Sequence, residues 1–277
     1  MNNYERLEGM VAATFTPMDE NGDVNLSVID KYADWIASTP VKGVFVCGTT
    51  GEFSSLTIDE RKAVLEKWVA SAAKRFKVIA HVGSNCQRDA MELASHAAQT
   101  GADAIASIAP SFFKPGTVDE LVDFFAPICR AASELPFYYY NMPSITGVNL
   151  PVDKFLIEGK KKIPNLVGTK FTHNNLMEMG GCIDLEQHKF EVLHGFDEIL
   201  IAGLSMGAVA GVGSTYNYIP NVYHTIFESM KQNDVETARA WQMKSIRTVE
   251  VIIKYGGGVR GGKAIMKLIG LDCGSCR

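Results

Sequence analysis

Asn165-Leu166-Val167-Gly168-Thr169-Lys170-Phe171-Thr172 has the apolar and β-branched composition of a buried strand, yet it contains a lysine. Side chains alternate along a strand, so one face is expected to carry Leu166, Gly168, Lys170 and Thr172 and the other Val167, Thr169 and Phe171. A buried amine without a charged partner is usually neutral, and a neutral amine can attack a carbonyl to form a Schiff base. The alternative is a lysine at a strand end that reaches water or pairs with a carboxylate.

The composition excludes several other classes of protein. Hydrophobic residues make up 47% of the 277 residues and charged residues 21%, which is typical of a soluble protein with a large core. The net charge is -4 with no basic run, so no nucleic-acid partner is expected. No apolar stretch approaches the roughly 18 residues of a membrane helix, and the segment 1–6 lacks the pattern of a signal peptide. Because the six cysteines are too sparse for a disulfide scaffold, we expect a cytoplasmic protein.

Short apolar runs alternate with segments of helical period along the chain, the pattern of repeated βα units. The expected strands are 9–16, 43–47, 77–83, 102–109, 137–140, 166–171, 191–194 and 208–212. Helices are expected between them, for example at 57–74, where Thr57 and Glu60 have the spacing of a capping box. The pattern predicts a (β/α)8 TIM barrel in a single domain, 1–277, with the barrel at 9–230 and a C-terminal helical extension at 234–270.

Two motifs near the C-terminus suggest sites but are better explained otherwise. The glycine run in 255–262 follows no strand and lacks the Gly-Lys-Ser/Thr ending of a phosphate loop, so a flexible turn between helices is expected. Cys273-Gly274-Ser275-Cys276 has the spacing of a redox motif, but no second cysteine pair accompanies it. We expect this segment to be a disordered tail.

The remaining unusual residues follow the predicted strands, where barrels of this type carry their active sites. Gly48-Thr49-Thr50-Gly51-Glu52 follows the second strand and could bind a carboxylate through backbone N–H groups and hydroxyls, although a plain turn also needs the glycines. Tyr140 ends the fifth strand, where it could exchange a proton with a substrate, while Tyr138 and Tyr139 are expected in the core.

The seventh and eighth strands are also followed by polar residues. Asp197 and Glu198 could accept hydrogen bonds from a polyol, although Asp197 could equally cap the next helix. Ser214 lies in a small, hydroxyl-bearing turn after the eighth strand. His173 and His194 lack a partner at metal-ligand spacing, so no metal site is expected.

Four motifs, in this order, resemble the class I pyruvate-lyase family typified by dihydrodipicolinate synthase and N-acetylneuraminate lyase. They are Gly48-Thr-Thr-Gly-Glu52, Tyr140-Asn-Met-Pro143, Gly168-Thr-Lys-Phe171 and Gly213-Ser-Thr215. The resemblance covers nearly the whole chain. It implies that Lys170 forms a Schiff base with pyruvate, that Tyr140 moves protons, and that Thr49 and Thr50 hold the pyruvate carboxylate. It also implies a homotetramer that needs no cofactor.

Within this family, a few positions favour the branch that acts on sialic acid. Synthases that use aspartate semialdehyde usually carry an arginine where this chain has Ile145, and a tyrosine in the loop that here reads Ser111-Phe112-Phe113-Lys114-Pro115. The resemblance therefore implies reversible cleavage of N-acetylneuraminate to N-acetylmannosamine and pyruvate. The residues that it places at the sugar chain are Thr172, Gly195, Asp197, Glu198 and Ser214.

Three alternatives remain open at this point. A sibling lyase for a 2-keto-3-deoxy sugar acid would keep Lys170 and Tyr140 but need other contacts around Asp197 and Ser214. A synthase using aspartate semialdehyde is disfavoured by Ile145. A metabolite-binding barrel without catalysis would not need both the lysine and the tyrosine.

Overall fold

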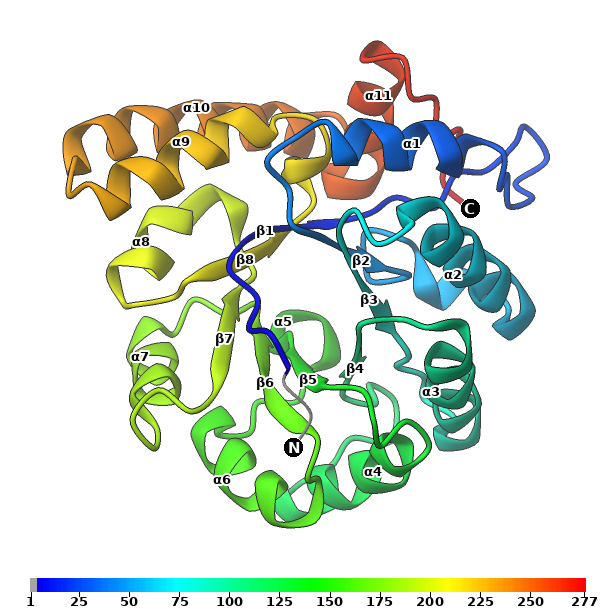
Figure 1. The fold of residues 1–277 in the computed structure, drawn as a ribbon, viewed down its shortest axis with the longest axis vertical. Coiled ribbons are helices and arrows are strands. Elements are labelled where there is room, and N and C mark those ends of the chain that lie inside the picture. Colours follow the sequence, from blue (N-terminus) through cyan, green and yellow to red (C-terminus); the bar gives the residue numbers. More distant parts are fainter. Residues whose placement is uncertain (1–3) are drawn as a thin grey trace.

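The computed structural model describes residues 4–277, so part of the segment inspected for a signal peptide, residues 1–3, lies outside it. Eight parallel strands follow one another in chain order and close into a barrel, because β1 pairs with both β2 and β8 (Figure 1). The strands are β1 Gly9–Ala13, β2 Gly43–Val46, β3 Lys77–His81, β4 Ala104–Ile108, β5 Phe137–Asn141, β6 Leu166–Phe171, β7 Glu191–His194 and β8 Ala210–Gly213. The predicted (β/α)8 barrel is confirmed, and each strand lies within four residues of its expected bounds.

Helices surround the strands and continue beyond β8. Those of the barrel are α1 Val28–Ala37, α2 Ile58–Ala72, α3 Gln87–Thr100, α4 Val118–Arg130, α5 Pro143–Thr146, α6 Val152–Lys162, α7 Leu176–Asp184, α8 Leu200–Ser205 and, after β8, α9 Pro220–Lys231. Two further helices follow: α10 Val235–Lys254 and α11 Gly257–Leu268. Short 3₁₀ turns are η1 Phe53–Ser55, η2 Asp197–Ile199 and η3 Thr215–Asn217. Across residues 4–277, no helix is long and apolar enough to span a membrane.

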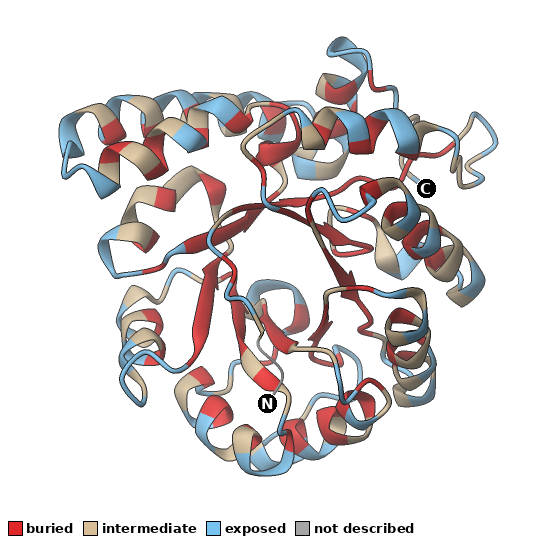
Figure 2. Cartoon of the chain, in the orientation of Figure 1, coloured by how far each residue is buried: buried red, intermediate tan, exposed pale blue. Residues whose placement is uncertain are grey.

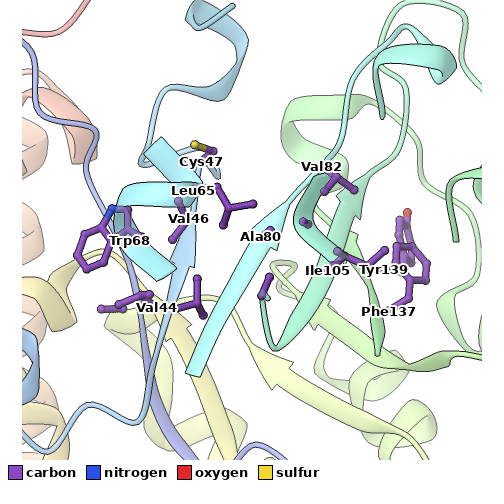
Figure 3. Packing of buried hydrophobic residues seen from close by; sticks show 14 of the residues in the cluster. Val44, Val46, Cys47, Leu65, Trp68, Ala80, Val82, Ile105, Phe137 and Tyr139 are labelled. Atoms are coloured by element: carbon purple, nitrogen blue, oxygen red, sulfur yellow. The ribbon is translucent and has the colours of Figure 1, made fainter. Parts of the chain in front are cut away.

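The helices dock on the strands through apolar faces, and local caps fix where they begin. The predicted capping box of α2 is present: Glu60 N–H donates to Thr57 Oγ1 (3.2 Å) and Thr57 N–H donates to the Glu60 carboxylate (2.8 Å). Figure 2 shows the strands buried almost throughout, whereas the helices alternate buried and exposed positions. In Figure 3, Leu65 and Trp68 of α2 lie beside Val44 and Val46 of β2, within the core between sheet and helices.

A bulge in β6 corrects the expected pattern of faces. The register against β5 shifts between Phe137 and Tyr138, so that Leu166 pairs with Phe137 but Gly168 pairs with Tyr138. Leu166 consequently packs in the outer core, and Val167 packs against the barrel interior, the reverse of strict alternation. A Cβ at Gly168 would lie 2.0 Å from the carbonyl oxygen of Glu191, so only glycine fits where β6 passes β7 this closely.

Of the two expectations for the C-terminal region, the turn between helices is present but shorter than expected, and the disordered tail is wrong. The turn between α10 and α11 is confined to Tyr255 and Gly256, and the rest of the glycine run forms the first turns of α11. The segment after α11 is ordered against the barrel rather than a disordered tail: the carbonyl of Cys273 accepts a hydrogen bond from Met18 N–H (3.1 Å), and Arg277 forms an ion pair with Glu60 (2.7 Å). These contacts join segments far apart in sequence, so local composition could not reveal them.

Candidate active site

Lys170 lies inside the barrel and is 4% exposed, in register with Tyr140 on the neighbouring strand β5. Its Nζ is 4.0 Å from the centroid of the Tyr140 ring and 4.3 Å from that of Phe45. Within residues 4–277, Lys170 forms no ion pair. In the described chain, Lys170 is therefore not paired with a carboxylate, which was the alternative that the sequence left open. Phe45, which sequence reasoning missed, is an inward-facing residue of β2.

The hydroxyl of Tyr140 links the lysine to the loop after β2. It lies 3.2 Å from Thr49 Oγ1 and 3.1 Å from the sulfur of Met142. Tyr140 is only 2% exposed, and its ring covers the lysine amine. An amine, a phenol and a threonine hydroxyl are thus arranged in sequence at the carboxyl ends of β6, β5 and β2. This order suits proton movement between neighbouring groups.

The Gly48–Glu52 loop is compact and strained at both ends. Cys47 (φ +53°) and Glu52 (φ +57°) are both in the left-handed conformation, which costs a non-glycine residue on the order of 1 kcal/mol or more. Glu52 N–H donates to the Thr49 carbonyl (3.0 Å), and Thr16 Oγ1 donates to the Gly51 carbonyl (2.8 Å). Thr49 and Thr50 are half-buried on this tight loop.

Thr172 and Gly195 meet where β6 and β7 end. Thr172 is 4% exposed, and among the described residues its Oγ1 has no hydrogen-bond partner. A Cβ at Gly195 would lie 2.0 Å from that oxygen, so glycine is required there for Thr172 to hold its place. A buried hydroxyl left without a partner is costly, and a ligand hydroxyl could relieve it.

Asp197 is buried at the start of η2, and it caps no helix. Its Oδ2 accepts hydrogen bonds from the N–H (2.8 Å) and the hydroxyl (2.5 Å) of Thr215, which ties the loop after β7 to the loop after β8. Burial raises the pKa of Asp197 to about 6, although the hydrogen bonds from Thr215 act in the opposite direction. Glu198 and Ser214 are half-buried beside these loops. Sequence reasoning placed Thr215 in a hydroxyl-bearing turn but did not pair it with Asp197.

Two buried histidines lie near the site. His194 is 1% exposed, and burial lowers its pKa to about 4. His81, which the sequence did not single out, hydrogen-bonds through Nδ1 to the Cys47 carbonyl (2.8 Å), and its ring stands edge-on to that of Tyr140. Burial and the nearby Arg61 hold the pKa of His81 well below its ordinary value. Residues 4–277 contain no group of three or more His, Cys, Asp or Glu side chains arranged to hold a metal ion.

Known proteins are similar to this chain over almost its full length. The model of the dihydrodipicolinate synthetase family matches residues 6–277. The chain belongs to this family. A mouse N-acetylneuraminate lyase is 44% identical over 268 residues, which cover 96% of this chain and 84% of the relative.

Solved structures within the family are similar over almost the full length. N-acetylneuraminate lyase from Proteus mirabilis superimposes with a TM-score of 0.96 at 38% identity, covering 99% of this chain and 92% of that structure. A structure described as the catalytic lysine mutant of a sialic acid aldolase from Ruminococcus gnavus has a TM-score of 0.93 at 27% identity, covering 100% of this chain and 90% of that one. The expected relationship to N-acetylneuraminate lyases is therefore confirmed.

Proposed function

We propose that this chain is a class I aldolase that cleaves N-acetylneuraminate reversibly into N-acetylmannosamine and pyruvate. The observation that carries the proposal is a buried lysine without an ion-pair partner in the described chain, covered by a tyrosine whose hydroxyl reaches a threonine. The N-acetylneuraminate lyases of mouse and Proteus mirabilis, to which the chain is similar over nearly its full length, support the choice of substrate.

In the proposed reaction, the amine of Lys170 attacks the C2 carbonyl of open-chain N-acetylneuraminate and water leaves. The resulting protonated imine accepts electrons, and Tyr140 takes the proton of the C4 hydroxyl as the C3–C4 bond breaks. N-acetylmannosamine departs and leaves the enamine of pyruvate. Protonation at C3 and hydrolysis of the imine then release pyruvate and the free lysine. The imine provides the electron sink, so the scheme needs no cofactor.

Other side chains would bind the two ends of the substrate. The hydroxyls of Thr49 and Thr50 would hold the carboxylate of pyruvate. Both threonines are half-buried and Thr49 lies beside Tyr140, which supports this role. The polyol chain would lie along the loops after β6, β7 and β8, where Thr172 lacks a partner among the described residues and Asp197 braces Thr215. The residues proposed to contact it are Thr172, Gly195, Asp197, Glu198 and Ser214.

Condensation of pyruvate with aspartate semialdehyde is the second candidate, because the matching family is named for dihydrodipicolinate synthetase. Ile145 lies on α5 and is 61% exposed, and an aliphatic side chain cannot form the two hydrogen bonds that an arginine offers a carboxylate. We therefore rank this activity below the sialic acid reaction.

We further propose that the enzyme works as a homotetramer in the cytoplasm. Phe112 and Phe113 in the loop after β4 are 78% and 87% exposed, which is unusual for phenylalanines and suits a contact with another subunit. All six cysteines lie within residues 4–277 and all are free thiols, which suits a reducing compartment.

A product assay with wild-type enzyme tests the substrate. N-acetylneuraminate should yield pyruvate and N-acetylmannosamine, and a panel of 2-keto-3-deoxy sugar acids should react more slowly. In the reverse direction, N-acetylmannosamine should condense with pyruvate faster than aspartate semialdehyde does. The opposite ranking would make the synthase activity the better assignment.

A further inference from the structure

Lys263 and Glu52 form a buried ion pair between α11 and the Gly48–Glu52 loop. Nζ of Lys263 lies 2.7 Å from Oε1 of Glu52, and the two side chains are only 2% and 8% exposed. Withdrawing two charges from water is unfavourable unless each is well paired, so a buried ion pair is weak evidence of added stability. Neither residue takes part in the proposed reaction, so the pair needs another explanation.

The glycine run explains how α11 comes close enough for this contact. A Cβ at Gly262 would lie 2.4 Å from the ring of Phe15, in the segment that follows β1. A Cβ at Gly261 would lie 2.9 Å from the side chain of Ile252 on α10. Larger residues at either position would push α11 away from its neighbours. The glycines therefore let Lys263, the next residue, reach the loop.

At the other end of the pair, Glu52 is held from several directions. Its Oε2 accepts a hydrogen bond from the backbone N–H of Arg277 (3.0 Å), while Lys263 Nζ also donates to the carbonyl of Ser275 (2.6 Å). Glu52 itself has φ +57°. A left-handed conformation in a residue other than glycine persists only where surrounding contacts enforce it. The ion pair is one of the contacts that can do so here.

Through Glu52 the ion pair is connected to the reacting groups. Glu52 N–H donates to the carbonyl of Thr49 (3.0 Å), and the hydroxyl of Thr49 lies 3.2 Å from that of Tyr140. The Tyr140 ring in turn covers the amine of Lys170. There is also an electrostatic consequence: without Lys263, the buried Glu52 carboxylate would repel an anion bound two or three residues away.

From these contacts we infer that Lys263 is a positioning residue for substrate binding. Through Glu52 it holds the Gly48–Glu52 loop in the conformation that receives the carboxylate of pyruvate. This inference rests on the proposed function, in which Thr49 and Thr50 bind that carboxylate. It makes α11, which lies outside the repeating βα units, necessary for the affinity of the site.

The test compares Glu52→Gln and Lys263→Met with wild-type enzyme. In Lys263→Met, the pyruvate concentration that half-saturates borohydride trapping of Lys170 should rise by roughly 10- to 100-fold, because the loop loses its support and the unpaired Glu52 carboxylate repels the anion. In Glu52→Gln it should rise less, by roughly 3- to 10-fold, because the ion pair that supports the loop is lost but no repelling charge remains. The kcat at saturating pyruvate in the condensation should fall much less than KM rises. Lys267→Met is the matched control, since Lys267 lies one turn further along α11 in an exposed ion pair with Asp272. It should behave as wild type.

Each outcome decides the inference. If the half-saturating pyruvate concentration is unchanged in both variants and only the melting temperature is lowered, the inference is overturned. If Lys263→Met does not fold, Glu52→Gln carries the test, because it preserves the side-chain shape and the hydrogen bond from Lys263 to Ser275. If wild-type enzyme forms no pyruvate adduct, the proposed function fails instead. Crystal structures of wild type and Glu52→Gln then decide: a displaced Gly48–Glu52 loop supports the positioning role, and an unmoved loop overturns it.

Discussion

The two ends of the barrel use similar side chains for opposite purposes. Tyr138 and Tyr140 are neighbours on the inward face of β5. At the amino end of the strands, the hydroxyl of Tyr138 donates to the Glu191 carboxylate (3.0 Å), and Tyr4 hydrogen-bonds to Tyr138. At the carboxyl end, the hydroxyl of Tyr140 meets Thr49 and its ring faces Lys170.

The difference lies in how completely each polar group is paired. Glu191 at the amino end also accepts a hydrogen bond from Leu7 N–H (2.9 Å), and the N-terminal segment crosses this end of the barrel (Figure 1). At the carboxyl end, Lys170 has no ion pair and Thr172 Oγ1 no hydrogen-bond partner among residues 4–277. Paired polar groups stabilise a fold, whereas unpaired ones are available to a ligand.

The largest expected effect is that of Lys170→Ala, which should abolish turnover while the protein still folds. Without the amine no imine can form. Mass spectrometry after pyruvate and borohydride should show one adduct in wild-type enzyme, on the peptide containing Lys170, and none in the variant. Lys154→Ala, at an exposed position on α6, is the control and should keep the adduct. An adduct on any other lysine would contradict the mechanism.

A direct comparison of the two ends comes from Tyr140→Phe and Tyr138→Phe. Tyr140→Phe should lower kcat by roughly 10²- to 10⁴-fold, the usual contribution of a positioned acid or base, with a smaller effect on pyruvate binding. Tyr138→Phe should leave kcat near the wild-type value and reduce the free energy of unfolding by about 1–3 kcal/mol, since it loses the hydrogen bonds to Glu191 and Tyr4. Equal losses of kcat in the two variants would remove the distinction between the ends.

Asp197 is an exception at the carboxyl end, since its carboxylate is already hydrogen-bonded to Thr215. Asp197→Ala should lower kcat/KM for N-acetylneuraminate by roughly 10- to 100-fold, which corresponds to about 1–3 kcal/mol for buried polar groups left unpaired. Trapping of pyruvate on Lys170 should stay unchanged. The control is Asp184→Ala, at an exposed position that ends α7. A matching loss of pyruvate binding in Asp197→Ala would show that Asp197 supports the whole site rather than the sugar.

Sequence predicted the barrel well because its signals are local and repeated. Each strand is a short apolar run followed by a helix of the right period, and the caps of α2 are visible in Thr57 and Glu60. The residues proposed for the site were also recognisable, since unusual polar residues such as Lys170 and Tyr140 follow or end strands. In a parallel barrel, all those positions lie at one end.

The features that sequence reasoning missed depend on contacts between distant segments. The bulge that exchanges the faces of Leu166 and Val167 arises from pairing with β5. The ordering of the segment after α11 depends on hydrogen bonds to Met18 and Glu60. Glu191 reads as an ordinary strand-end acid, and only the fold brings it against Tyr138. Alternation and composition carry no information on such pairs.

Glu191→Gln is expected to have the smallest effect on turnover and tests whether the amino end serves stability alone. Burial raises the pKa of Glu191 to about 7 from its ordinary 4.5, although the Leu7 N–H, Arg6 and Tyr4 oppose this shift. The folded protein therefore favours the protonated acid, and this stabilisation is greatest below about pH 4.5 and is lost as the pH rises to about 7.

Glutamine is neutral at every pH but still offers an acceptor oxygen. Urea unfolding should thus show a free energy of unfolding that falls between pH 5 and pH 8. This fall should be smaller in the variant by up to about 2 kcal/mol. The kcat at pH 7.5 should remain that of wild type. Parallel losses of stability in both proteins, or a large fall in kcat, would mean that Glu191 is not a purely structural acid and that the two ends are less distinct than their hydrogen bonds indicate.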